Sequence, residues 1–353
     1  MVTPGAPSVL RVGDRRLGGG NRCFVIAEAG VNHNGDMDLA MRLVDAAAEA
    51  GADAVKFQTF RAGKLVTKWA PKAAYQEENT GEGGTQFDML RKLELPPERF
   101  REIAERCAGR GILFLSTPFD EDSADLLESI GVPAYKVSSG DLTDIPFLRH
   151  LASKGLPILL STGMGTLDEV REAMAALSAA PGVALLHCVS SYPADPAHVN
   201  LRAMDTMRRA FGVPVGYSDH TEGLAVALAA VALGAAVLEK HFTLDRGLPG
   251  PDHKASLEPA ELARLVRELR AVEQAMGHGR KEPAPSEIET ARVARKSLVA
   301  ACDIPEGTVI EAGHLASRRP GTGIPPGMRD GLIGRKTKVS VAAGAPIEWE
   351  MLE

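Results

Sequence analysis

The chain has 353 residues, a length that suggests about two domains. A composition of 44% hydrophobic and 24% charged residues is typical of a folded protein with a large core. The net charge of -6 argues against nucleic acid and anionic membranes as partners. The longest uncharged apolar run covers only residues 224–238, and no apolar block lies near the N-terminus. We therefore expect a cytoplasmic protein without a membrane span.

The region from residue 24 to residue 277 alternates short runs rich in Val, Ile and Leu with longer segments of helical periodicity. Strands are predicted at residues 24–28, 54–57, 112–116, 134–137, 158–161, 184–187, 213–217 and 235–239. Helices are predicted at residues 37–50, 97–109, 121–130, 144–153, 167–176, 201–210, 223–233 and 259–276. Eight such units indicate an α/β fold of the (β/α)8 TIM barrel type. A doubly wound sheet is the alternative, but no GxGxxG turn follows the first strand.

Three segments depart from this alternation. Residues 9–16 are predicted to form a hairpin that caps the floor of the barrel. Residues 61–95 are too long for a simple βα loop and are expected to cover the top of the barrel. After residue 276 the chain becomes rich in Gly, Pro and charge, and then forms short apolar runs at 297–302 and 336–341. We therefore assign residues 1–278 to the barrel, 279–290 to a linker and 291–353 to a small β-rich domain.

Reactive side chains gather where the barrel strands end, which is where active sites of such barrels lie. Lys56 and Gln58 share one face of their strand because strand side chains alternate with a period of two. In chain order, the eight strand ends supply Glu28, Lys56 and Gln58, Ser116 and Thr117, Lys136 with Ser139 and Asp141, Ser161, His187 with Tyr192, Ser218 with Asp219 and His220, and Glu239 with His241.

Two lysines and several hydroxyl groups facing one cavity make an anion site suited to phosphate and carboxylate. Taken alone, Lys56 or Lys136 is as well explained as one partner of a buried ion pair. Lysine also suits Schiff-base chemistry, so a class I aldolase that uses free pyruvate is an alternative.

His220 and His241 close two neighbouring strands and can ligate a divalent ion with imidazole nitrogen. Glu239 precedes His241 by two residues and points the same way, either as a third ligand or as a carboxylate beside the ligands. The alternative is that both histidines form hydrogen bonds to a substrate.

The chain resembles the sialic acid synthase family of phosphoenolpyruvate-condensing enzymes in its motifs AEAGVNHNG, VKFQTF, STPFD, YKVSSGD, STGM, HCVSSYP, GYSDHT, EKHFT and GPDHKASLEP. Its last sixty or so residues, with SRRPGTGI, LIGRK and AGAPI, resemble the antifreeze-like (SAF) domain that ends those proteins. The resemblance runs from about residue 24 to the end, in the family's order.

This resemblance implies a metal-dependent condensation of phosphoenolpyruvate with an open-chain N-acetylated aminosugar, giving a nine-carbon 2-keto acid and phosphate. The implied acceptor is N-acetylmannosamine, giving N-acetylneuraminate, or 2,4-diacetamido-2,4,6-trideoxymannose, giving legionaminate. The implied cofactor is Mn²⁺, with Mg²⁺ or Co²⁺ as alternatives. A domain-swapped homodimer is implied, in which Arg319 completes the sugar site of the neighbouring subunit.

The family's residue roles fall on specific positions of this chain. The resemblance implies metal ligation by His220 and His241, and catalysis by Glu28, Asp141, Lys56 and Lys136. It implies phosphoenolpyruvate contacts from Lys56, Lys136, Ser139, Ser161 and Ser218, and sugar contacts from Gln58, Tyr192, Asp252 and Arg319. Asp141 stands where many relatives have Glu, and Ser190 stands where some have Asn.

A third alternative is a carbohydrate-binding protein without catalysis, since the C-terminal domain resembles a binding module. The density of ionisable groups at eight strand ends argues against it, because a lectin does not need them.

Overall fold

The structure is a computed structural model that describes residues 8–81 and 83–353, so the first seven residues of the predicted barrel domain lie outside it. The chain divides into two compact units, Met1–Gly277 and His278–Glu353. The segment predicted as a linker, 279–290, includes the 3₁₀ helix Pro285–Glu287 and the start of α12 (Ile288–Ala294).

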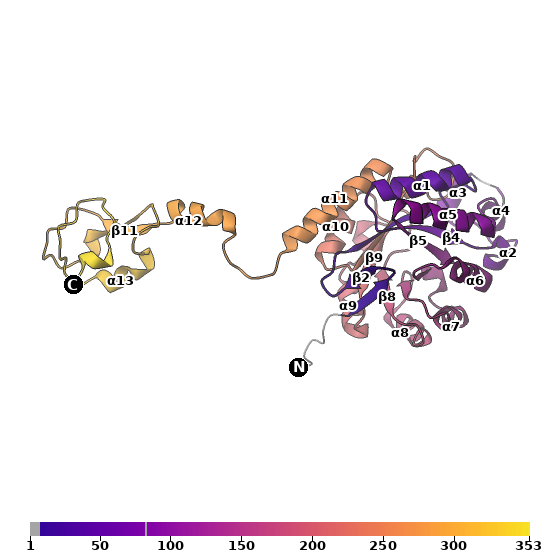
Figure 1. Ribbon diagram of the computed structural model, residues 1–353, viewed down its shortest axis with the longest axis horizontal. Helices are drawn as coiled ribbons and strands as arrows, with labels where there is room; N and C mark the ends of the chain where they lie inside the picture. Colours follow the sequence, from indigo (N-terminus) through magenta and orange to yellow (C-terminus); the bar gives the residue numbers. More distant parts are fainter. Residues whose placement is uncertain (1–7, 82) are drawn as a thin grey trace. The chain divides into compact units, whose positions relative to one another are not determined.

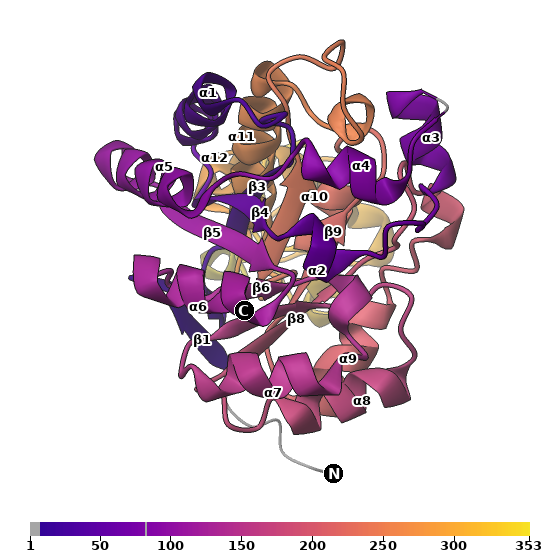
Figure 2. The ribbon, with the colours of Figure 1, turned by 90° about the vertical axis from the view of Figure 1, so that its right-hand side faces the viewer.

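The first unit is built on eight parallel strands. They are β3 (Phe24–Gly30), β4 (Ala54–Thr59), β5 (Leu113–Pro118), β6 (Tyr135–Val137), β7 (Ile158–Ser161), β8 (Val183–His187), β9 (Val215–Asp219) and β10 (Val237–His241). Their order in the sheet is β5-β4-β3-β10-β9-β8-β7-β6. The two end strands, β5 and β6, also contact each other, so the sheet curls into a barrel (Figure 2). The TIM barrel prediction is confirmed.

Helices surround the strands (Figure 1). They are α1 (Met37–Glu49), α5 (Pro97–Arg110), α6 (Glu121–Ile130), α7 (Ile145–Ser153), α8 (Leu167–Ala176), α9 (Ala203–Phe211), α10 (Ala225–Ala232) and α11 (Pro259–Met276). In α1 the buried residues Ala40, Leu43, Val44 and Ala47 follow the three- and four-residue spacing of one helix face. Asp36 caps this helix by accepting hydrogen bonds from the amides of its first turn.

The predicted hairpin closes the floor of the barrel. It consists of β1 (Val9–Val12) and β2 (Arg15–Gly18), which pair antiparallel. Val12 and Leu17 are fully buried in a cluster with Ile26, Leu115 and other inward-facing residues of the strands. The hairpin therefore fills the lower end of the barrel, and the opposite end is left for a cavity.

Five strands, namely β3, β4, β5, β9 and β10, extend further at their C-terminal ends than their sequence pattern predicts. β9 and β10 both end two residues later than expected, at Asp219 and His241. Polar residues suggested a strand end, but inside a barrel they can pair with one another and remain in the sheet. The functional groups of these strands are thus held on regular backbone.

Residues 61–95, called the insertion below, contain α2 (Ala62–Leu65), α3 (Ala74–Thr80) and α4 (Gln86–Arg91). Met89, Leu90 and Leu93 pack there on Val31 and Phe60, which follow β3 and β4. The insertion therefore lies over the C-terminal ends of these strands, as predicted.

The second unit contains the antiparallel pair β11 (Ser297–Ala300) and β12 (Leu315–Arg318), with α13 (Arg329–Leu332). β11 confirms the predicted strand at 297–302. The predicted strand at 336–341 is wrong. Its residues form single bridges to three separate segments, Lys336 to Val309, Thr337 to Leu352 and Val341 to Ile304, so they do not form one continuous ladder.

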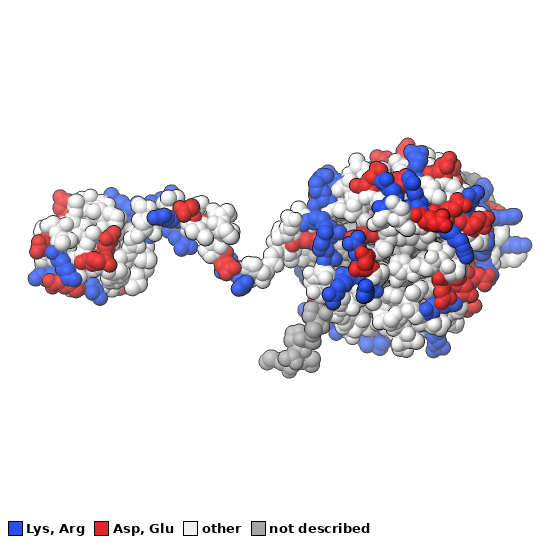
Figure 3. Space-filling model, in the orientation of Figure 1, with Lys and Arg blue, Asp and Glu red and all other residues white. Residues whose placement is uncertain are grey.

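On the face of the barrel unit drawn in Figure 3, charged side chains of both signs lie near one another, and a broad area near the centre carries neither. Among the helices of the described residues, none is long and apolar enough to cross a membrane.

Candidate active site

A cavity of about 470 Å³ opens at the C-terminal ends of the barrel strands. Its size lies within the usual range for small-molecule sites. Its polar lining residues come from every part of the barrel and include Glu28, Lys56, Gln58, Thr117, Lys136, Ser139, Ser161, Ser218, His220, Glu239 and His241. The predicted strand-end residues are therefore largely brought together.

Two lysines and two glutamates form a buried charge network at the base of the cavity. Lys56 Nζ lies 2.8 Å from Glu28 Oε2 and 3.6 Å from Glu239 Oε2. Lys136 Nζ lies 3.6 Å from Glu239 Oε1. Ser218 Oγ donates a hydrogen bond of 2.7 Å to Glu239 Oε1. Glu239 therefore bridges both lysines, as an ion-pair partner.

Burial and charge oppose each other in this network. Burial raises the pKa of Glu28, and the Lys56 ammonium only partly offsets that effect. Burial acts in the same direction on Glu239, but Lys136 and Lys56 outweigh it and hold the pKa of Glu239 below its usual value. Burial lowers the pKa of Lys136, whereas Glu239 and Glu28 overcome burial and raise the pKa of Lys56.

Hydroxyl groups extend the network along one side of the cavity. Lys136 Nζ donates a hydrogen bond of 2.7 Å to Ser161 Oγ. Lys56 Nζ donates one of 2.9 Å to Thr117 Oγ1. Ser139 Oγ accepts a hydrogen bond of 2.9 Å from the amide of Gly163. Cations and hydroxyl groups thus converge as an anion requires.

The two histidines lie together, with ring centroids 5.6 Å apart. His220 Nδ1 donates a hydrogen bond of 2.7 Å to the carbonyl of Val189, which leaves Nε2 as the unprotonated nitrogen. Burial lowers the pKa of both imidazoles and so favours their neutral forms. His241 Nδ1 is buried and has no hydrogen-bond partner within the described part of the chain.

This pair is suited to a divalent cation. Neutral imidazole is a common ligand of divalent transition-metal ions, and the carbonyl of Val189 fixes the His220 tautomer as partners of metal-binding histidines do. The described residues contain no group of three or more His, Cys, Asp or Glu side chains that could hold a metal ion. Glu239 Oε1 accepts a hydrogen bond from Ser218, and both lysines lie beside this carboxylate, so the two imidazoles are the nitrogen donors of the site.

Three polar groups on the other side of the cavity converge on Gly30. A Cβ atom there would lie 3.3 Å from Glu28 Oε1, 3.4 Å from Gln58 Nε2 and 3.8 Å from Asp252 Oδ2. Gly30 has a φ of +53°, a conformation that favours glycine. Gln58 Nε2 donates a hydrogen bond of 3.3 Å to Glu28 Oε1. Burial raises the pKa of Asp252 to about 6.

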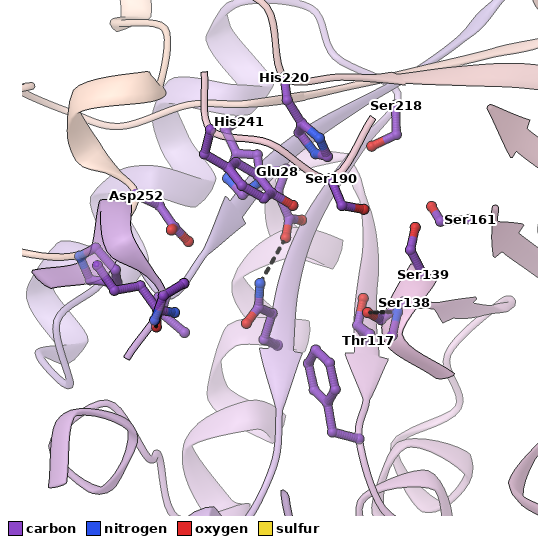
Figure 4. A pocket seen from close by; sticks show the side chains of 18 of the residues that line it. Glu28, Thr117, Ser138, Ser139, Ser161, Ser190, Ser218, His220, His241 and Asp252 are labelled. Carbon is purple, nitrogen blue, oxygen red and sulfur yellow. Dashed lines mark hydrogen bonds between the residues drawn. The ribbon is translucent and has the colours of Figure 1, made fainter. Parts of the chain in front are cut away.

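Figure 4 shows how these groups divide the cavity. Ser139, Ser161 and Ser218 lie on one side, and Asp252 lies on the other. Glu28 and the two labelled histidines lie between the two sides. The labelled polar groups thus divide into a hydroxyl side and a carboxyl side, with the histidines between them.

One aromatic ring lies against the histidines, and a second ring lies against the first. The ring of Tyr192 lies 4.2 Å from that of His220 and 5.7 Å from that of His241. Tyr75, from α3, lies 5.1 Å from Tyr192. Tyr75 was not predicted as a site residue, because nothing in the periodicity of the insertion indicates which of its residues point inward.

Asp141 is not brought into this cluster. Ser138, Ser139 and Gly140 line the cavity, whereas Asp141 is not among the lining residues. Its Oδ2 atom is buried without a hydrogen-bond partner among the described residues. Arg319 belongs to the second unit, where it is exposed.

Comparisons with known proteins agree with this chemistry. A model of the NeuB family matches residues 43–281, and a model of the SAF domain matches residues 295–353. The chain is 46% identical over 347 residues to the N,N'-diacetyllegionaminic acid synthase of Legionella pneumophila, covering 97% of this chain and 98% of that protein. It is 47% identical over 307 residues to the protein of that name from Campylobacter jejuni, covering 86% of this chain and 92% of the relative.

A solved structure also matches. It is the N-acetylneuraminic acid synthetase of Leptospira borgpetersenii in complex with citrate, with a TM-score of 0.71 and 39% identity. The match covers 80% of this chain and 95% of that one.

Proposed function

Because the chain belongs to the NeuB family and ends in a SAF domain, we propose that it condenses phosphoenolpyruvate with an open-chain N-acetylated aminosugar. The products are a nine-carbon 2-keto acid and inorganic phosphate, and the enzyme is a transferase of the synthase type. The observation that carries the proposal is the division of one cavity into a lysine and hydroxyl side and a carboxyl side, with two neutral imidazoles between them.

Phosphoenolpyruvate binds on the lysine and hydroxyl side. Lys136 with Ser161, and Lys56 with Thr117, already form hydrogen bonds there and offset the negative charge of the phosphate and carboxylate groups. Ser139 and Ser218 supply further hydroxyl groups. Glu239 faces both ammonium groups, so phosphoenolpyruvate competes with this carboxylate for them.

His220 and His241 would hold a divalent cation. The family resemblance implies Mn²⁺, with Mg²⁺ or Co²⁺ as alternatives. When bound, such an ion polarises the aldehyde oxygen of the sugar as a Lewis acid. The chain's own contribution is to keep both imidazoles neutral, through burial, and to fix the tautomer of His220.

Glu28 is the proposed general acid and general base. C3 of phosphoenolpyruvate attacks the aldehyde carbon, and the aldehyde oxygen takes up a proton. Water then adds to C2 and releases a proton. The C2–O bond to phosphate breaks as the new C2 hydroxyl becomes the keto group, and the proton of that hydroxyl leaves with the phosphate. One carboxyl group can give the first proton and take the second. Glu28 fits because burial raises its pKa and because it contacts Gln58 within the cavity.

The proposed acceptor is 2,4-diacetamido-2,4,6-trideoxymannose. The part of the insertion that lines the cavity is uncharged and largely apolar, with Leu65, Met89, Leu90 and Leu93 beside Tyr75. Such a wall favours a methyl group and acetamido groups over a charged substituent. A phosphorylated sugar would find no lysine or arginine besides Lys56 and Lys136 among the described lining residues. The names of the two bacterial relatives point the same way.

A homodimer completes the proposal. The second unit is small and exposes Val309, Met328, Val339 and Trp349, which favours docking on another surface. We place that surface on the barrel of a second copy of the chain, where Arg319 would contact the acetylated sugar.

Phosphate release from phosphoenolpyruvate tests the function. Release should require the aminosugar, proceed faster with the diacetamido sugar than with N-acetylmannosamine, and stop when EDTA removes the metal. Borohydride trapping of a pyruvate adduct on Lys56 or Lys136, with activity that survives EDTA, would instead support the aldolase. Sugar binding without turnover would support the carbohydrate-binding protein.

A further inference from the structure

A second buried ion pair lies behind the histidines. On β10, Glu239 and His241 line the cavity, so Lys240 between them points through the other face of the barrel wall. On β9 and its turn, Ser218 and His220 line the cavity, and Asp219 lies between them. Lys240 and Asp219 are direct register partners of the two parallel strands.

The two charged side chains bind each other and the turn that carries His220. Lys240 Nζ lies 2.7 Å from Asp219 Oδ2 and 2.7 Å from the carbonyl oxygen of Thr221. Asp219 Oδ1 accepts hydrogen bonds from the amide and the hydroxyl of Thr221, at 2.9 Å and 2.8 Å. The residues on both sides of His220 are therefore tied to one ion pair.

Water does not compete for this pair, because the side chains of Lys240 and Asp219 are only 2% and 0% exposed. A fully buried ion pair seldom makes a protein more stable than well-packed apolar residues of the same size would, and its use can instead be to specify one geometry. Here the geometry specified is that of the backbone between Asp219 and Thr221.

We propose that the Asp219–Lys240 pair is a positioning device that fixes the imidazole of His220 relative to that of His241. It acts through the backbone of the turn and does not contact substrate. The proposal rests on the proposed function, in which the two imidazoles hold a divalent cation. As a consequence, side chains on the outer face of β9 and β10 determine the position of a side chain in the cavity on the inner face.

The test replaces both charges with apolar groups of similar size, in the double variant Asp219→Leu/Lys240→Met. A matched control, Asp53→Leu/Arg270→Met, removes the ion pair between Asp53 Oδ2 and Arg270 Nη2, 3.0 Å apart at the opposite end of the strands. Thermal unfolding of both variants checks that they fold.

The first readout is the tautomer of His220 in metal-free protein, from ¹⁵N resonances of labelled histidine assigned with the variant His220→Asn. Wild type and control should show protonated Nδ1 only, as the hydrogen bond to Val189 requires. The double variant should show exchange between both tautomers. An unchanged tautomer in the double variant would overturn the proposal.

The second readout is titration with Mn²⁺ alone. We expect the double variant to bind Mn²⁺ about 10- to 100-fold more weakly, as when the outer partners of metal ligands are removed, and the control to bind as wild type does. Equal affinities in the double variant and the wild type would also overturn the proposal. If His241→Ala leaves Mn²⁺ binding intact, the metal assignment of the proposed function is wrong, and the tautomer of His220 still decides the positioning role.

Discussion

Lys136 and Lys56 lie in one charge network, yet their pKa values shift in opposite directions. Burial dominates at Lys136 and lowers its pKa, whereas at Lys56 two carboxylates outweigh burial. The pKa of Lys136 is therefore the lower of the two, and an incoming anion would stabilise its charged form. Its contact with Ser161 places it on the proposed phosphoenolpyruvate side.

Lys136→Ala should raise the KM for phosphoenolpyruvate by roughly 10- to 100-fold, since a hydrogen bond to a charged group is lost. The KM for the aminosugar should change little. Initial rates with one substrate varied at a time measure both constants. Lys154→Ala, which removes a lysine paired with Asp125 on the outer helices, is the control. An effect confined to the sugar KM would contradict the placement of Lys136.

His241→Ala should abolish turnover and lower the content of divalent metal, because one imidazole alone is too weak a site. Metal content after dialysis, measured by mass spectrometry of the ion, checks the ligand role directly. Turnover and metal stoichiometry equal to those of wild type would remove His241 from the proposed metal site.

Asp141 should affect stability more than catalysis. Burial, with a smaller contribution from Asp144, raises its pKa to about 7. Between about pH 4 and 7 the native state therefore keeps a proton that the unfolded chain has lost, so this residue lowers stability as pH rises through that window. Above about pH 7 the loss of stability caused by Asp141 no longer changes with pH.

Asp141→Asn removes this penalty. The gain in free energy of unfolding over wild type should be larger at pH 8 than at pH 5 by about 2 to 3 kcal/mol. Urea unfolding at both pH values measures it, with the exposed Glu222→Gln as control. Turnover should be largely kept in Asp141→Asn and lost in Glu28→Gln. A gain that does not change with pH would show that Asp141 is ionised throughout.

At the scale of elements, the β1–β2 hairpin supports the barrel without touching the cavity. Leu17 is fully buried in the floor, whereas Val9 on the paired strand is 43% exposed. Leu17→Ala should cost about 2 to 5 kcal/mol of stability, and Val9→Ala about 0.5 kcal/mol or less. The KM values should stay unchanged in both variants. A raised KM in folded Leu17→Ala at 25 °C would mean that the floor shapes the site.

The barrel and the charged residues of its cavity could be predicted from sequence because their signals are local. Strand runs, helical periodicity and strand-end positions sufficed to place Lys56, Lys136, His220 and His241 around one cavity. The role of Lys240 was hidden, because its partner Asp219 is 21 residues away and the pair forms only once β9 and β10 are neighbours. In the second unit, residues 336–341 look like a strand, but bridges to three distant segments decide their structure.

At the scale of the molecule, the two units raise the question of which barrel Arg319 serves. Arg319→Ala subunits and His241→Ala subunits should each be inactive alone. If Arg319 acts on the partner's barrel, a mixed dimer has one intact site and one site with both lesions. Random pairing of equal amounts should then restore about a quarter of the wild-type rate.

Subunit exchange is verified with two affinity tags on the same preparations. If exchange is complete and no activity returns, every site has kept one lesion and Arg319 serves its own barrel. Activity in unmixed Arg319→Ala protein would instead remove Arg319 from the sugar site.

The central claim is that phosphoenolpyruvate condenses with the aminosugar in this cavity through cleavage of its C2–O bond. The measurement that tests it most directly uses phosphoenolpyruvate labelled with ¹⁸O in the oxygen that bridges C2 and phosphorus. Mass spectrometry then follows the phosphate and the nine-carbon product in reactions with 2,4-diacetamido-2,4,6-trideoxymannose. We predict one labelled phosphate for each 2-keto acid formed, and no phosphate when the sugar is omitted or His241 is replaced by Ala. Phosphate release without sugar, or label retained in the keto acid, would contradict the account.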